Sequence, residues 1–300
     1  MADHVWNVKH AYRKATPLKA LTLVLVAAAL HVGWNVMVKR IGERQVFTWW
    51  ALVIGSVVYL PLLALHTPIP ATIWSYAISS ALVEAAYYIT LMRAYAHGDF
   101  SLVYPIARGA APALLAVWSI VFLGERPQLA GTAGLALMLI GLLVVGSGHW
   151  WAHRQEAALP MGGIGSALST ALCISIYSVI DGAAVRLMAP APYTVLVFGL
   201  TGVVITPVVI THYGYHALVA AWRTHWCRIL TVGILTLLTY LLVLQAYAMA
   251  RVSYVGALRE VSIVLAALVG WGWLGESFGT VRTVGAILIF FGILAITMGG

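Results

Sequence analysis

A few ionisable side chains lie within long apolar stretches of the sequence. They are His31, Glu84, Arg108, Asp181, Arg259 and Glu260. Placing a charge at the centre of a membrane helix costs on the order of 3 kcal/mol even on lenient insertion scales, and such residues usually line a cavity or pair with one another. The pattern therefore predicts a polar site inside the membrane.

The two arginines are the predicted contacts for an anionic group of a substrate. A guanidinium group is planar and can grip a carboxylate or a phosphate with two parallel hydrogen bonds. Arg108 lies about 12 Å into its predicted helix, and Arg259 about 9 Å into a helix that runs the opposite way, so both approach the midplane. Tyr104 and Tyr254 precede the arginines by four and five residues, and we expect both to contact the body of the ligand.

The buried acids have a different predicted role. Glu84 and Glu260 are expected to bind a substrate amine or to carry a coupling proton, and His31 is a further candidate proton site. The alternative is structural: Arg108 would pair with Glu84, and Arg259 with Glu260 or another acid. Asp181 stands five residues before Arg186, close to a membrane face, and we interpret it as structural.

The chain repeats these features about half its length apart. Arg108 with the later Leu123-Gly124-Glu125 recurs as Arg259 with Leu274-Gly275-Glu276, at an offset of 276 − 125 = 151. The glycines that follow recur at the same offset, since Gly134 and Gly141 in the first copy correspond to Gly285 and Gly292 in the second. We expect Glu125 and Glu276 to be helix caps or hinges. We expect the glycines to form a smooth face for close helix packing.

Composition places the protein in a lipid bilayer. Hydrophobic residues make up 62% of the chain and charged residues only 9%, far below the roughly 25% of soluble domains. The net charge of +8 comes from scattered basic residues, which argues against nucleic-acid binding. Two cysteines cannot form a disulfide framework and lack metal-ligand spacing. No nucleotide-binding, zinc-protease or serine-hydrolase motif is present, so we predict no catalytic residue, no cofactor and no metal.

The apolar segments divide into ten predicted membrane helices, because each span needs about 20 residues. They cover residues 18–38, 47–65, 73–96, 100–123, 129–147, 162–187, 192–210, 229–249, 253–274 and 281–298. We expect an all-α integral membrane protein with a cytoplasmic tail (1–17), a first five-helix repeat (18–148), an interfacial connection (149–161) and a second five-helix repeat (162–300). Five spans per repeat, an odd number, require the two repeats to be inverted relative to each other, as in many transporters.

Orientation depends mainly on the N-terminal tail. Basic residues outside the predicted site divide almost evenly between the two sides, seven against eight, but four of the seven, Lys9, Arg13, Lys14 and Lys19, cluster before the first helix. By the positive-inside rule we expect both termini in the cytoplasm and a multi-pass protein of the cytoplasmic (inner) membrane.

Several motifs resemble those of EamA-type members of the drug/metabolite transporter superfamily. They are the stretch from Gly98 to Gly109 (GDFSLVYPIARG), Trp34-Asn35 ahead of Lys39, and the Leu-Gly-Glu at each junction of the fourth and fifth spans of a repeat. The stretch from Val252 through Arg259-Glu260 to Glu276 looks like the second repeat of that family. The resemblance covers essentially the whole chain and implies a ten-helix transporter with alternating access around a central cavity.

Together these patterns predict a secondary transporter that exports a small polar organic metabolite, amino-acid-like or anionic, with protons as a candidate coupling ion. Its partners would be the substrate and membrane lipid, and no nucleic acid. A flippase for a lipid-linked headgroup is the first alternative and would need a lateral opening toward lipid. A membrane-embedded enzyme or sensor is the second, and its ionisable residues would cluster at one interface.

Overall fold

The computed structural model describes residues 17–39, 41, 44–64, 68–97, 100–126, 128–152, 161–262, 264–265 and 280–298. These residues form helices and their connections, and no strand occurs among them. The helices are α2 (Pro17–Lys39), α3 (Arg44–Tyr59), α4 (Pro61–Ala64), α5 (Ala71–His97), α6 (Phe100–Leu123), α7 (Leu129–Ala152), α8 (Met161–Ala184), α9 (Pro190–Met249), α10 (Val252–Arg259) and α12 (Thr280–Met298). The prediction of an all-α chain is confirmed for this part of the molecule.

The predicted spans coincide with these helices, with two differences at the second and ninth. The second span is divided at Leu60 into α3 and the single turn of α4. The ninth is helical from Val252 to Arg259, turns at Glu260 and is helical again at residues 261–262 and 264–265, while its residues 263 and 266–274 lie outside the described ranges.

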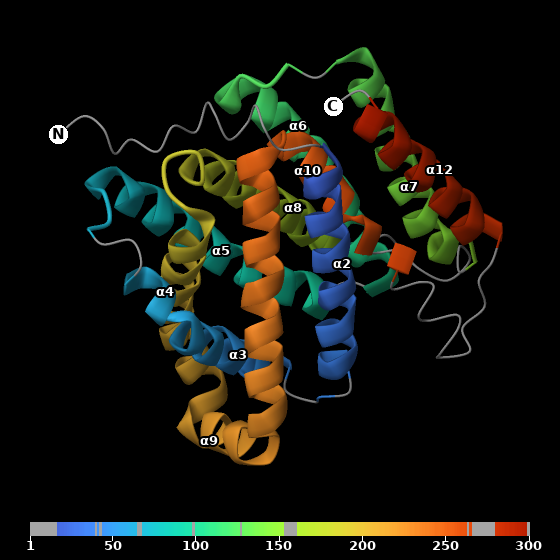
Figure 1. Cartoon of the computed structure of the whole chain (residues 1–300). Helices are drawn as coiled ribbons and strands as arrows, with labels where there is room; N and C mark the ends of the chain where they lie inside the picture. Colours follow the sequence, from blue (N-terminus) through green and yellow to red (C-terminus); the bar gives the residue numbers. More distant parts are fainter. Residues whose placement is uncertain are drawn as a thin grey trace.

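The connection predicted between the seventh and eighth spans, residues 211–228, is mostly helical. It belongs to α9, which turns back on itself at the bottom of Figure 1. The helical backbone is interrupted at Gly214, with φ 76° and ψ 158°, and at His225, with φ −128° and ψ 16°. A positive φ suits glycine because it has no Cβ. Helix α9 therefore consists of two long arms joined by a short helix, where the sequence had predicted a connection between two separate spans.

Helices α7 and α12 pack closely through the predicted glycine face. A Cβ at Gly134 would stand 2.7 Å from the carbonyl oxygen of Gly292, and one at Gly141 would stand 2.8 Å from that of Gly285. Such distances leave no room for a side chain, so the helix backbones approach each other as small residues allow. The prediction of close packing through these glycines is confirmed.

The two halves of the chain interlock instead of lying apart. Helix α5 of the first half packs against α8 of the second, and α2 of the first packs against the α9 of the second. Helices α3 and α9 also cross closely, because a Cβ at Gly55 would stand 2.6 Å from the carbonyl oxygen of Gly233. A polar site in the interior therefore receives side chains from both halves.

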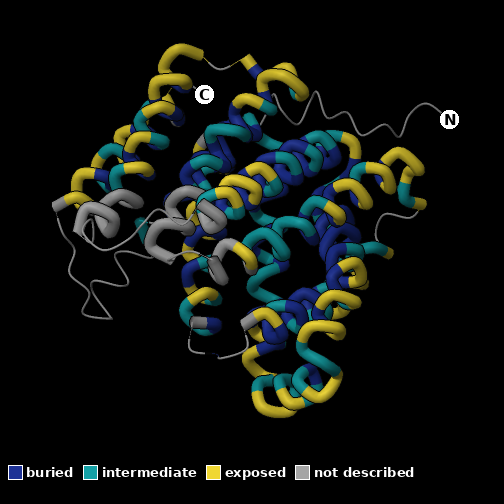
Figure 2. The backbone as a smooth tube through the Cα atoms, turned by 180° about the vertical axis from the view of Figure 1, so that it is seen from behind, coloured by how far each residue is buried: buried dark blue, intermediate teal, exposed yellow. Residues whose placement is uncertain are grey.

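The outer surface is apolar, as lipid contact requires. Exposed positions lie on the outward sides of the helices and buried positions on the inward sides (Figure 2). Phe122, Leu129 and Val203 are 68%, 88% and 70% exposed. In the described residues, three helical stretches are long and apolar enough to cross a membrane, namely Leu18–Val38, Ile164–Ala184 and Pro190–Met249.

Candidate functional site

Two buried carboxyl groups from α5 and α8 lie in the interior beside α9. Glu84 of α5 is 5% exposed, and Thr201 of α9 donates a hydrogen bond of 2.9 Å to its Oε2. Asp181 of α8 is fully buried, and its Oδ1 accepts a hydrogen bond of 2.8 Å from the Tyr193 hydroxyl. Its Oδ2 accepts a second hydrogen bond from the hydroxyl of Tyr240. Both acids are thus held by hydroxyl groups.

The two acids belong to one cluster. Glu84 and Asp181 lie close enough for their charges to interact, and the Tyr240 hydroxyl is near Glu84 as well as bonded to Asp181. Because Asp181 lies only three residues before the end of α8, its place in the sequence suggested a membrane face. The structure shows that Asp181 is fully buried and faces inward, so its predicted position at a membrane face is wrong, while its structural role stays a prediction.

Arg259 ends α10 beside the same cluster. Its Nη1 donates a hydrogen bond of 3.2 Å to the Tyr247 hydroxyl, and its guanidinium carbon lies 5.9 Å from the centroid of the Tyr240 ring. Within the described part of the chain, no carboxylate lies at ion-pair distance from Arg259. A largely buried cation whose neighbours are neutral phenols can accept an anionic group from a ligand.

Arg108 has a carboxylate partner. Its Nε lies 3.0 Å from Oε2 of Glu260, and its Nη2 donates a hydrogen bond of 3.3 Å to Ser262. The side chains of Arg108 and Glu260 are 15% and 5% exposed. The structure therefore pairs Arg108 with the acid that follows Arg259, an ion pair between the two repeats that the sequence did not suggest.

His31 of α2 lies near both arginines. Its charge would interact with those of Arg108 and Arg259. The imidazole ring packs edge-on against Trp34 at 4.9 Å between centroids, and the His31 carbonyl accepts a hydrogen bond of 2.7 Å from Asn35. The structure thus brings His31 to the arginine side of the cluster.

Of the two predicted tyrosines, the structure places the side chain of Tyr254. The side chain of Tyr104 lies outside the described residues, although its backbone belongs to α6. Tyr254 is buried, but its hydroxyl packs against Gly131 of α7 and accepts a hydrogen bond of 3.3 Å from Arg251. These contacts point Tyr254 toward α7, away from Arg259.

Sequence reasoning missed the hydroxyl groups that hold the cluster. They come from Thr201, Tyr193, Tyr240 and Tyr247. Tyrosine and threonine are common in apolar helices, so their type gave no signal. Only the return of the second arm of α9 toward α8 and α10 brings them to the charged residues.

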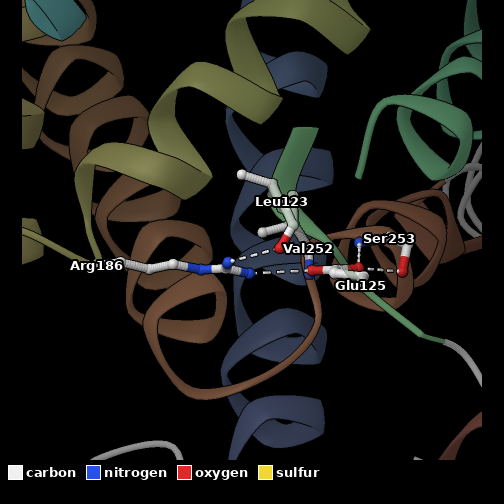
Figure 3. A network of polar contacts seen from close by, with 5 residues as sticks. All are labelled: Leu123, Glu125, Arg186, Val252 and Ser253. Atoms are coloured by element: carbon white, nitrogen blue, oxygen red, sulfur yellow. Dashed lines mark hydrogen bonds and ion pairs between the residues drawn. The ribbon is translucent and has the colours of Figure 1, made fainter. Parts of the chain in front are cut away.

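Glu125 has a structural role (Figure 3). Its carboxylate accepts hydrogen bonds of 2.6 Å from the backbone N–H of Val252 and 3.2 Å from that of Ser253, and one of 2.6 Å from the Ser253 hydroxyl. Arg186 lies 3.2 Å from Glu125 and donates a longer bond of 3.5 Å to the Leu123 carbonyl. The cap predicted at Glu125 is present, but on α10 and not on the helix that follows it in sequence. Glu276, its counterpart, lies outside the described residues.

The described residues contain no cluster of three His, Cys, Asp or Glu side chains placed to hold a metal ion. The polar groups at the site are carboxylates, phenols and guanidinium groups. Groups of these kinds can bind charged and polar groups of a ligand, and carboxyl groups can also exchange protons.

Comparison with known proteins agrees with the fold. One solved crystal structure of a protein superposes on 94% of this chain and 98% of its own, with a TM-score of 0.73 and 18% sequence identity, which shows a shared fold. No protein with a curated description matches the sequence.

The model of the EamA-like transporter family matches the chain twice, at residues 18–147 and 161–298. The two matches together cover most of the sequence and correspond to its two repeats. Members of this family are multi-pass membrane transporters and not enzymes. The chain therefore belongs to the EamA-like transporter family.

Proposed function

We propose that the protein is a secondary transporter that exports a small polar organic metabolite, amino-acid-like or anionic, by alternating access. The observation that carries this proposal is Arg259, a largely buried cation with no carboxylate at ion-pair distance in the described structure. Glu84 and Asp181 interact with Arg259 electrostatically, but neither forms an ion pair with it. An anionic substrate group can supply that direct partner and gain binding energy from it.

The acids beside Arg259 provide the opposite charge. The hydroxyl of Tyr240 meets Asp181, its ring faces the Arg259 guanidinium, and Glu84 interacts electrostatically with Asp181. A ligand with both an anionic and a cationic group finds a partner for each. Arg108 and Glu260 form a neutralised pair, and we propose that they border the same route.

Alternating access follows from an inverted arrangement of the two repeats, which we also propose. The packing of α5 on α8 and of α2 on α9 is the reciprocal pairing that a pseudo-twofold axis would produce. The closely packed α7 and α12 occupy corresponding places in the two repeats. In transporters of this type one bundle rocks against the other around a fixed central site.

The membrane assignment rests on the basic residues before the first helix. They favour an N-terminus in the cytoplasm, and ten spans would return the C-terminus to the same side. We propose the cytoplasmic membrane as the location, with the Glu125 cap on the cytoplasmic side.

Reconstitution tests the proposal. Purified protein in liposomes is offered pools of labelled amino acids, organic anions and sugar phosphates, and flux is compared for wild type, Arg259→Gln and the control Arg223→Gln. Arg223 is exposed on α9, so its loss should leave flux unchanged. Flux of one pool that disappears only in Arg259→Gln is the expected result.

Two outcomes contradict it. Equal flux in Arg259→Gln and wild type would remove Arg259 from the site. No flux for any pool, with folded protein, would overturn the small-metabolite substrate and favour a lipid-linked one.

A further inference from the structure

The bend of α9, residues 211–228, is a positively charged end of the molecule. The whole of α9 contains two arginines, Arg223 and Arg228, and no lysine, aspartate or glutamate. Both arginines are exposed, and both lie at the bend, at the bottom of Figure 1. Positive charge that is concentrated at one exposed end attracts anions.

The bend lies at the depth of lipid headgroups. Each arm of α9 corresponds to one predicted membrane span, so the bend between the arms reaches the membrane surface. Trp226 on the bend is 53% exposed, and Trp222 packs against Trp50 of α3 at 5.0 Å between ring centroids. Tryptophan is enriched at the headgroup level because its ring is apolar and its N–H is polar. The exposed side of the bend is therefore placed beside lipid phosphates.

A hollow of about 340 Å³ opens in the bend, lined by five consecutive residues. They are Thr224, His225, Trp226, Cys227 and Arg228. The hollow forms at the break in helical geometry at His225, with φ −128° and ψ 16°. A hydroxyl, an imidazole and a guanidinium group line it, and each can donate a hydrogen bond. None of the five residues is acidic.

Packing against α3 holds the hollow in shape. The ring of His225 meets that of Phe47 edge-on, at 6.3 Å between centroids, and Phe47 is fully buried. On the other side of Arg223, the indole N–H of Trp50 donates a hydrogen bond of 2.9 Å to the carbonyl of Leu218. Because α3 contacts the bend before and after Arg223, the donors around the hollow are preorganised for a ligand.

We propose that this hollow binds the phosphate group of an anionic phospholipid. Arg228 is the charged partner, since a guanidinium group can grip a phosphate with two parallel hydrogen bonds. Thr224 and His225 donate further hydrogen bonds, and Trp226 lies in the headgroup layer beside them. Basic pockets at the ends of membrane helices are suited to such headgroups. This site is independent of the proposed transport function.

The charge of the bend selects an anionic lipid over a zwitterionic one. Both kinds of lipid carry a phosphate, but a zwitterionic headgroup also brings a choline or ethanolamine cation. Helix α9 has no carboxylate to pair with that cation. The cation would instead lie near Arg223 and Arg228, where like charges repel. A headgroup with net negative charge has no such cost.

Native mass spectrometry of the full chain tests the site. The protein is released from detergent micelles that hold equal amounts of phosphatidylglycerol, which is anionic, and phosphatidylcholine, which is zwitterionic. Wild type should retain phosphatidylglycerol preferentially. Arg228→Gln should reduce this preference about tenfold, because a hydrogen bond between two charged groups is lost. Arg223→Gln is the matched control, since it removes the same charge outside the hollow, and it should stay within about twofold of wild type.

Thermal unfolding gives a second measurement. Arg228 is exposed, so Arg228→Gln should fold, and its unfolding midpoint without added lipid should match that of wild type. Added phosphatidylglycerol should raise the midpoints of wild type and Arg223→Gln, because a ligand that binds the folded protein stabilises it. The rise should be smaller in Arg228→Gln.

Three results would overturn the proposal. They are a wild type that retains the two lipids equally, an Arg228→Gln variant with the preference of wild type, and equal losses in the two arginine variants. Equal losses would mean a diffuse attraction to the charged bend and no defined site. Inorganic phosphate separates a lipid from a free anion. If phosphate at the same concentration raised the midpoint as much as phosphatidylglycerol, the ligand would be a soluble anion and the assignment to a lipid would be wrong.

Discussion

The carboxylate of Glu125 accepts a hydrogen bond of 2.6 Å from the backbone N–H of Val252, 127 positions later in the chain. Val252 begins α10, the helix that ends at Arg259. The first N–H groups of a helix have no partner within the helix, and an acidic side chain there also meets the positive end of the helix dipole. Glu125 of the first repeat thus fixes the start of the short helix that ends at Arg259 in the second repeat.

Removing this cap should lower stability. Glu125→Ala is expected to cost on the order of 2 kcal/mol, because it leaves two buried N–H groups of α10 without an acceptor. Arg126→Gln is the control, since Arg126 is exposed next to it and should change stability little. Thermal unfolding of the protein in detergent measures both. Equal midpoints for Glu125→Ala and wild type would contradict the cap.

The contact between Glu125 and Arg186 should appear as an energetic coupling. The side chains of Glu125 and Arg186 are 3% and 25% exposed and 3.2 Å apart. Their exposure is intermediate between that of a surface ion pair and that of a fully buried one. A double-mutant cycle with Glu125→Gln and Arg186→Gln should give a coupling of about 1 kcal/mol. Arg186 also donates to the Leu123 carbonyl, and this bond cancels in the cycle. Additive effects of the two changes would mean that the ion pair contributes nothing.

Most of the fold could be predicted because it depends on features local in sequence. Each span is a run of apolar residues, and the repeat is visible in polar and glycine positions such as Arg108, Arg259, Gly134 and Gly292. The helical character of residues 211–228 could not, because tyrosine, tryptophan, histidine and arginine are equally typical of interfacial loops and of interfacial helices. There the backbone breaks only at Gly214 and His225.

The charged residues of the candidate site could be predicted from the sequence, but which of them pair with each other could not. An ionisable residue in an apolar stretch is visible in the sequence, so Glu84, Arg108 and Arg259 could be named. Which acid meets which arginine depends on how distant helices pack. Arg108 pairs with Glu260, 152 positions away, and Asp181 meets Tyr240, 59 positions away. No periodicity within one helix contains that information.

The contact of α7 with α12 should tolerate no added methyl group at its centre. In Gly134→Ala the new Cβ would stand 2.7 Å from the Gly292 carbonyl, so the helices must separate, at a cost of about 1 to 3 kcal/mol. Gly165→Ala is the matched control, since nothing lies within 4 Å of a Cβ there. Alanine in an open helical position should be neutral or stabilising by up to about 1 kcal/mol. Unfolding midpoints that move alike in the two variants would show that the close approach has no energetic importance.

The two arginines should respond differently to the same substitution. Arg108→Gln leaves the carboxylate of Glu260, 5% exposed, without its cation. Breaking a buried pair in this way typically costs about 3 to 5 kcal/mol, and the 15% exposure of Arg108 favours the lower end. Arg259→Gln removes a hydrogen bond to the neutral Tyr247 and a contact with the Tyr240 ring, so its cost should stay below about 1.5 kcal/mol.

Thermal unfolding and transport together distinguish the two roles. Arg108→Gln should lower the unfolding midpoint, and Arg108→Gln with Glu260→Gln should recover part of the loss, because the double variant buries no unpaired charge. Arg259→Gln should keep a nearly normal midpoint and lose transport. A large destabilisation by Arg259→Gln would mean that its charge serves the fold. In that case the buried cation would have a structural counter-charge, and the reason for expecting an anionic ligand at Arg259 would disappear.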